Sequence, residues 1–198
     1  ARRGVLSLSC RSGRNGGTHV TSSPEKAGAV QSAIRLGRRT FTKKHEDYIG
    51  LEFLVTVLGG YFGSRLMKNI REDKGYTYGI GAANVSFLHD GYFFIATEVG
   101  VDVTEATIHE IYREMEILRR NEIPEKELEL VKNYLYGKML RSFDGPFNAM
   151  DQYLSVHKFG YDNAYFHRRL NEIAQMTAGN LSILANKYLQ ADEMLEIV

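Results

Sequence analysis

Residues 58–79 read LGGYFGSRLMKNIREDKGYTYG, and this stretch decides how the chain is divided into helices and strands. Its first glycine pair, Gly59-Gly60, ends one helix and permits a close reversal of the chain. Ser64 then suits the N-cap of a second helix, which we predict from about residue 63 to residue 72. Arg71 falls in the last turn of that helix, where the helix dipole favours a positive charge.

A strand should follow this helix, because Gly75 supplies the backbone freedom that a sharp exit requires. The residues after it predict two strands, over 75–87 and 91–99. Asp90-Gly91 lies at their junction, and Asp-Gly is typical of tight hairpin turns. The sequence therefore predicts an antiparallel hairpin directly after the helix.

The two tyrosines of this stretch fall in the first strand of the predicted hairpin. Because side chains alternate along a strand, Tyr76 and Tyr78 would point to the same face. We therefore expect the helix that ends near Arg71 to lead directly into a strand that contains Tyr78. That strand should pair antiparallel with residues 92–99.

The elements on either side indicate the fold class. Upstream, an apolar segment over 29–36 predicts a first strand, and a broad apolar helical face runs from near His45 to Gly59. Downstream, apolar residues recur at the three- and four-residue spacing of buried helices. The predicted elements there are helices over 102–118, 124–139, 147–158, 163–175 and 178–189, and a last strand over 193–198. Hairpin strands followed by a run of helices indicate an α+β fold, with an antiparallel sheet packed against several helices.

Length and composition favour one domain. With 198 residues, of which 43% are hydrophobic and 25% charged, the chain can bury one substantial core. Residues 1–26 are rich in Gly, Ser and Arg and show no sustained periodicity, so we expect a linker or leader there. The single domain should then cover residues 27–198.

The charge balance and the apolar runs exclude two classes of partner. A net charge of +1 argues against a nucleic-acid binder, which normally concentrates Lys and Arg on one face. No apolar run reaches the roughly 20 residues that span a bilayer, so we expect a soluble domain with no membrane partner. Cys10 is the only cysteine, which leaves the compartment open between cytoplasm and periplasm.

The residues for independent hydrolytic chemistry are missing. A zinc-binding helix of a peptidase carries two histidines four residues apart with a catalytic glutamate between them. No two of the six histidines have that spacing; they are His19, His45, His89, His109, His157 and His167. A G-x-S-x-G nucleophile motif is also absent, since Ser64 lacks the second glycine. We therefore expect no metal site and no catalytic residue in this chain.

Residues 58–79 as a whole resemble a known signature. They match the pattern G-G-x-x-x-S-R-L, then R-E-x-x-G-x-x-Y, of M16 (pitrilysin and insulinase-like) metallopeptidases, and the similarity extends over about residues 27–198. The zinc motif of that family, H-x-x-E-H, is absent. The chain therefore resembles the zinc-free, C-terminal-type domain, and the resemblance implies a fold like that of the mitochondrial processing peptidase.

The resemblance also implies a divided mechanism. In the family, an Arg and a Tyr of the zinc-free domain reach toward the substrate backbone beside the zinc, and by motif these match Arg71 and Tyr78. Tyr76 lies where the family often has an apolar residue, so the roles of the two tyrosines stay open. The chain alone should be inactive, with zinc in a partner M16 domain, in the same chain or a separate subunit, and a peptide as substrate. The alternative is a structural or assembly subunit that keeps the M16 fold.

Overall fold

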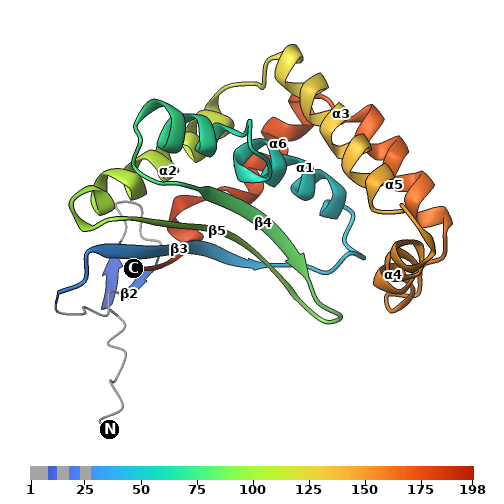
Figure 1. Cartoon of the computed structure of the whole chain (residues 1–198), viewed down its shortest axis with the longest axis horizontal. Helices are drawn as coiled ribbons and strands as arrows, with labels where there is room; N and C mark the ends of the chain where they lie inside the picture. The colour runs from blue at the N-terminus through green and yellow to red at the C-terminus, as the bar shows by residue number, and fades with distance from the viewer. Residues whose placement is uncertain (1–8, 13–17, 23–27) are drawn as a thin grey trace, which may run out of the picture.

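The computed structural model describes residues 9–12, 18–22 and 28–198. Within these ranges the chain forms one curved sheet with helices packed on one face (Figure 1). The strand order is β1-β2-β6-β3-β5-β4. The arrangement confirms the predicted α+β class.

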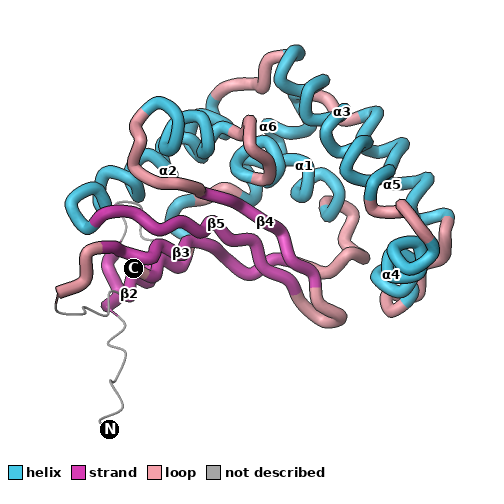
Figure 2. Tube along the Cα trace, viewed as in Figure 1, coloured by secondary structure: helices cyan, strands magenta, loops and turns pink. Residues whose placement is uncertain are grey.

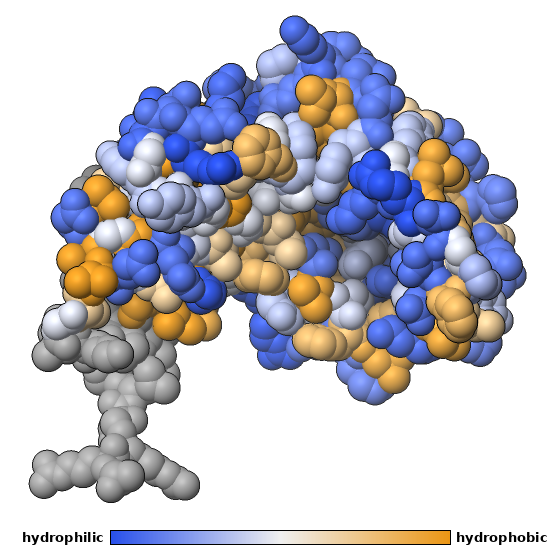
Figure 3. Space-filling model, viewed as in Figure 1, coloured by the Kyte–Doolittle hydropathy of each residue, from blue (hydrophilic) through white to orange (hydrophobic). Residues whose placement is uncertain are grey.

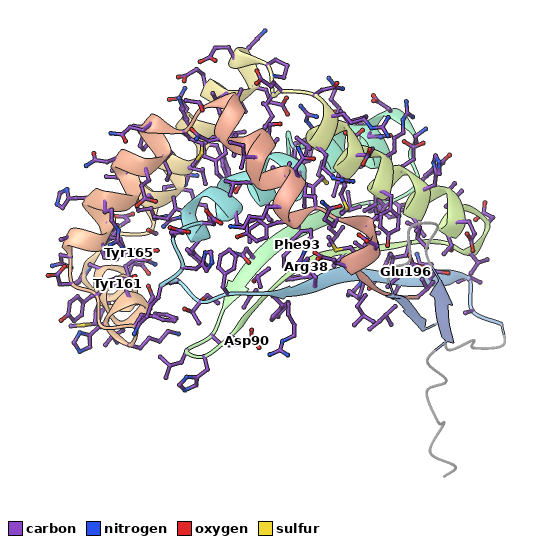
Figure 4. The ribbon with its side chains drawn as sticks, turned by 180° about the vertical axis from the view of Figure 1, so that it is seen from behind. Arg38, Asp90, Phe93, Tyr161, Tyr165 and Glu196 are labelled. Atoms are coloured by element: carbon purple, nitrogen blue, oxygen red, sulfur yellow. The ribbon has the colours of Figure 1, made fainter. Side chains whose placement is uncertain are left out.

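Three long strands make the centre and one edge of the sheet. β5 (Gly91–Gly100) pairs antiparallel with both β3 (Gln31–Thr40) and β4 (Ile80–Ser86). The predicted hairpin between β4 and β5 is confirmed, and the backbone N–H of Phe87 donates to the carbonyl of Asp90 at 2.8 Å across its turn. Figure 4 places Asp90 at the tip of this hairpin, where its carboxylate accepts a hydrogen bond from Arg39 Nε at 3.0 Å.

One detail of the hairpin prediction is wrong. β4 begins at Ile80, so residues 75–79 lie outside the strand and Tyr78 belongs to the loop before it. Gly75 has a φ of 67°, and Thr77 makes local hydrogen bonds with Gly79 in place of a strand ladder. The helix near Arg71 therefore leads into an ordered loop, and the strand starts only after it.

Short strands complete the other edge. β6 (Leu195–Ile197) pairs antiparallel with β3 and parallel with β2 (Thr18–Ser22), and β2 pairs antiparallel with β1 (Ser9–Ser12). β1 and β2 lie within the segment expected to be a linker or leader. They are only four and five residues long, which is too short for a recognisable alternation of apolar side chains. The predicted last strand is present as β6.

The helices follow the predicted ranges and cover one face of the sheet (Figures 1 and 2). They are α1 (Tyr48–Gly59), α2 (Thr104–Arg120), α3 (Glu125–Arg141), α4 (Pro146–His157), α5 (Ala164–Gln175) and α6 (Ala178–Tyr188), with short 3-10 turns η2 (Val101–Val103) and η3 (Ala191–Glu193). Every residue of α1 except Glu52 is buried. This helix therefore lies between the sheet and the other helices.

The core joins the inner face of the sheet to α1. Its largest fully buried side chains include Ile34 and Phe93 from the sheet and Phe53 from α1. The outer surface of the helices is mostly hydrophilic, with separate apolar patches (Figure 3). Among the described residues, none of the helices combines the length and the apolar character that crossing a bilayer requires.

Candidate functional site

The helix that carries Arg71 has an unusual geometry. It is present where predicted, but residues Met67–Asp73 form a π-helix, η1, with a wide turn. Its signature is the hydrogen bond from the backbone N–H of Lys74 to the carbonyl of Asn69 at 3.1 Å, which joins residues five apart. π-turns are rare and occur frequently at functional sites.

Ser64 does not act as the predicted side-chain cap. Its carbonyl accepts from the backbone N–H of Lys68 at 3.0 Å, but its hydroxyl is buried and has no hydrogen-bond partner in the described part of the chain. The next residue secures the start of this helix instead. Arg65 donates two hydrogen bonds to the carboxylate of Glu127 on α3, at 2.8 and 2.7 Å.

The rest of the π-helix is held from two directions. Met67 and Ile70 point into the core, and Ile70 is completely buried. On the side that faces α2, Asn69 Nδ2 donates to Glu110 at 2.9 Å and to Glu114 at 2.7 Å. The ammonium group of Lys74 lies 3.4 Å from Glu110.

Glu110 stays ionised in this contact. Burial alone would raise its pKa, but the hydrogen bond from Asn69 and the positive charges of Lys74 and Arg113 together hold the pKa below its usual value. The side chain is only 10% exposed. A buried carboxylate with these partners is a strong link between α2 and the π-helix.

Arg71 lies on the partly exposed side of the π-helix. Its guanidinium stacks over the ring of Phe62, 4.7 Å from the ring centroid. Within the described residues it makes no ion pair with Glu72, Asp73 or any other acid, so its charge is not neutralised by a neighbour. Among the described residues, Arg71 is therefore not half of a surface ion pair.

The two tyrosines have different surroundings. Tyr76 is partly buried, packs against the core, and has the ammonium group of Lys74 at 5.9 Å from its ring centroid. Tyr78 is 95% exposed. The predicted common strand face is thus absent, and Tyr78 is the more exposed of the two tyrosines.

The main chain around Tyr78 is nevertheless fixed. Thr77 Oγ1 donates to the carbonyl of Glu98 at 2.8 Å, and Thr97 Oγ1 donates to the carbonyl of Gly79 at 3.0 Å. Thr97 lies on β5 and is 4% exposed, so this anchor reaches into the core. A shallow pocket of about 310 Å³ adjoins Tyr78, with Arg35 and Glu98 on its wall.

No metal-binding cluster is found among the described residues, where no group of three His, Cys, Asp or Glu side chains converges. The expectation that this chain binds no zinc stays a prediction for metal analysis. The chemistry that the Arg71 and Tyr78 region can perform is hydrogen-bond donation, since an arginine and a tyrosine hydroxyl both present donors to a carbonyl oxygen.

Comparison with known proteins identifies a family and a shared fold. The family described as "Peptidase M16 inactive domain" matches residues 15–135. The zinc protease YmxG of Bacillus subtilis is 28% identical over 134 residues, which cover 68% of this chain and 33% of that protein.

Two solved structures share the fold. A peptidase M16 inactive domain from Pseudomonas fluorescens superposes with a TM-score of 0.78 at 23% identity, over 85% of this chain and 40% of that one. A protease from Helicobacter pylori gives a TM-score of 0.83 at 19% identity, over 91% of this chain and 44% of that one. The chain thus spans less than half the length of these proteins.

Proposed function

Because the chain belongs to the peptidase M16 inactive domain family, we propose that it is the substrate-binding, zinc-free half of a zinc-dependent peptidase. The catalytic zinc would lie in a partner M16 domain, in the same full-length chain or in a separate subunit. The relative YmxG is about three times as long as the part it shares with this chain, which leaves room for such a domain.

The observation that carries the proposal is the state of Arg71. A charged guanidinium without an acidic partner, stacked on an aromatic ring and presented on a π-turn, is prepared to bind an oxygen-rich ligand. A peptide backbone offers carbonyl oxygens, and a tyrosine hydroxyl from Tyr78 can donate to the same group or to the negative charge that develops on it.

The work of the assembled enzyme would then be divided. A zinc ion bound in the partner domain would supply Lewis-acid chemistry for the hydrolysis. Arg71 and Tyr78 bind the peptide backbone beside that bond and keep it in the reactive orientation. Neither residue of this chain needs to gain or lose a proton for that task.

The test is the substitution Arg71→Ala in the complete peptidase, meaning this domain assembled with its zinc-bearing partner. Removing a hydrogen bond to a charged group costs about 1.5–3 kcal/mol, so kcat/KM should fall roughly ten- to 150-fold. If Arg71 binds substrate and transition state equally, KM should rise while kcat stays the same; a loss in kcat indicates transition-state stabilisation.

A matched control separates this role from the loss of any surface charge. Arg120 on α2 is 75% exposed and pairs with Glu116, and Arg120→Ala should leave kcat/KM unchanged. The zinc content of the complex should be the same in all variants. An assembled Arg71→Ala complex with wild-type kcat/KM would reject the proposal and favour the alternative of an assembly subunit.

A further inference from the structure

One carboxylate of α2 contacts the Arg71 segment on both sides of the arginine. Glu110 accepts a hydrogen bond from Asn69, two residues before Arg71, at 2.9 Å. It also lies 3.4 Å from the ammonium group of Lys74, three residues after it. Glu110 therefore contacts the side chains of two residues that flank Arg71.

The wide turn of the π-helix is what makes this double contact fit. Side chains three or four residues apart share a face of an α-helix, whereas Asn69 and Lys74 are five apart. In the π-turn the backbone N–H of Lys74 bonds to the carbonyl of Asn69 at 3.1 Å, and both side chains reach Glu110. In an α-helical turn at this place, the side chains of Asn69 and Lys74 would lie on different faces of the helix. The direction of the Arg71 side chain would change as well.

We propose that Glu110 is a positioning residue for Arg71: its carboxylate holds Asn69 and Lys74 together, keeps residues 67–73 in the π-turn, and so directs the guanidinium toward Phe62 and the substrate. This inference rests on the proposed function, in which Arg71 binds the peptide substrate. In this inference Glu110, on α2, does not contact the substrate and affects catalysis only through the position of Arg71.

The chemistry of the contact suits a fixed link. Glu110 is buried, and Arg113 lies 3.4 Å from it in addition to Asn69 and Lys74. The imidazole of His109 lies 3.9 Å away. Glu114 shares the amide of Asn69 at 2.7 Å, so the amide is held by two carboxylates of α2. Because a charge of this kind is expensive to leave without partners, the π-turn that supplies the partners is favoured over an α-turn.

The experiment is a double-mutant cycle in the complete peptidase. Glu110→Gln keeps the size of the side chain and removes its charge, and it should lower kcat/KM on the order of tenfold through misplacement of Arg71. In the Arg71→Ala background the same change should alter kcat/KM by less than about twofold, because the group through which Glu110 acts is already gone. Glu116→Gln, on the same helix and paired with Arg119 and Arg120, is the control and should leave kcat/KM unchanged.

A second variant and a second readout protect the test from a folding defect. Lys74→Met removes the ammonium group that contacts Glu110, at a partly exposed position. This variant should lower kcat/KM as Glu110→Gln does. In the Arg71→Ala background it should have almost no further effect on kcat/KM. In both variants, amide hydrogen exchange should become faster in residues 67–74 and stay unchanged in α1.

The outcomes separate the inference from the proposed function. A wild-type kcat/KM for Arg71→Ala overturns both. A clear effect of Arg71→Ala, together with no effect of Glu110→Gln, overturns the inference alone. Losses that multiply in the double variant also overturn it, because they indicate that Glu110 supports the domain by a route other than Arg71.

Discussion

The segments that carry Arg71 and Tyr78 are adjacent in sequence but are held in opposite ways. The π-helix Met67–Asp73 has buried side chains beneath it and a charged link to α2, and its arginine already rests on an aromatic ring. The following loop is held by the side-chain hydroxyl of Thr77 and by the carbonyl of Gly79, while the Tyr78 side chain is 95% exposed. The Arg71 side chain is thus oriented by a contact within the domain, whereas the Tyr78 side chain projects from the surface.

The largest expected effect tests the buried side of the first segment. Ile70 is completely buried, so Ile70→Ala should lower the free energy of unfolding by about 2–5 kcal/mol. Tyr78→Ala, in the exposed loop, should change it by less than about 0.5 kcal/mol. Urea unfolding of both variants measures these changes in the free energy of unfolding. Similar decreases for the two variants would contradict the view that the two segments are held in different ways.

The next expected effect is the pH dependence of the charged link. The pKa of folded Glu110 lies below its ordinary value of 4.5, so the ionised form stabilises the fold. That stability is fully present above about pH 4.5 and is lost as the pH falls through the lower, folded pKa. The groups that face Glu110 are Asn69 and Lys74 from the segment after α1, and His109, Arg113 and Glu114 from α2 itself.

The measurement compares wild type with Glu110→Gln across pH. Hydrogen bonds to a charged group contribute about 1.5–3 kcal/mol, so wild type should be more stable by an amount of this order above pH 4.5. The difference should shrink at lower pH, as Glu110 becomes protonated and resembles the neutral amide. A difference that is independent of pH between about 3 and 6 would contradict the ionised link.

The sequence allowed a prediction of most of the fold and of only part of the site. Helix ranges were predictable because the apolar spacing along α2 and α3 is set by local periodicity, and the hairpin because Asp90-Gly91 is local turn chemistry. The π-turn was not predictable, since its partner Glu110 lies 41 residues away from Asn69. No spacing rule in the sequence connects Glu110 to Arg71.

The loop before β4 shows the same limit. The alternation of tyrosines around Thr77 favoured a strand, and local propensity gave no sign of the hydrogen bonds that Thr77 makes 20 and 21 residues downstream, to Thr97 and Glu98. The bond from Thr77 gives the carbonyl of Glu98 a partner, and the hydroxyl of Thr97 donates to that of Thr77. Long-range side-chain contacts thus decided both the π-turn and the loop before β4.

A smaller expected effect concerns the anchor of that loop. Thr97→Val keeps the shape of the side chain but removes the hydroxyl that donates to the carbonyl of Gly79, which should lower stability by about 1 kcal/mol. Thr56→Val is the matched control, because Thr56 is equally buried and its hydroxyl bonds to the carbonyl of Glu52 within α1. Both variants should lose similar stability, and only Thr97→Val should lower kcat/KM of the complete peptidase. An equal loss of activity in both would show that the anchor has no specific role in placing Tyr78.

The smallest expected effect, and the one that assigns the tyrosines, is Tyr78→Phe. The hydroxyl of Tyr78 is exposed and has no hydrogen-bond partner in the described part of the chain, so its removal should leave stability unchanged within about 0.5 kcal/mol. A neutral hydrogen bond contributes about 0.5–1.5 kcal/mol, so kcat/KM should fall roughly two- to tenfold, less than for Arg71→Ala.

Tyr76→Phe is the comparison, because Tyr76 packs against the core and should need its ring rather than its hydroxyl. If Tyr76→Phe lowered kcat/KM while Tyr78→Phe did not, the ligand-facing tyrosine would be Tyr76, and the loop would have to turn over when the partner domain binds.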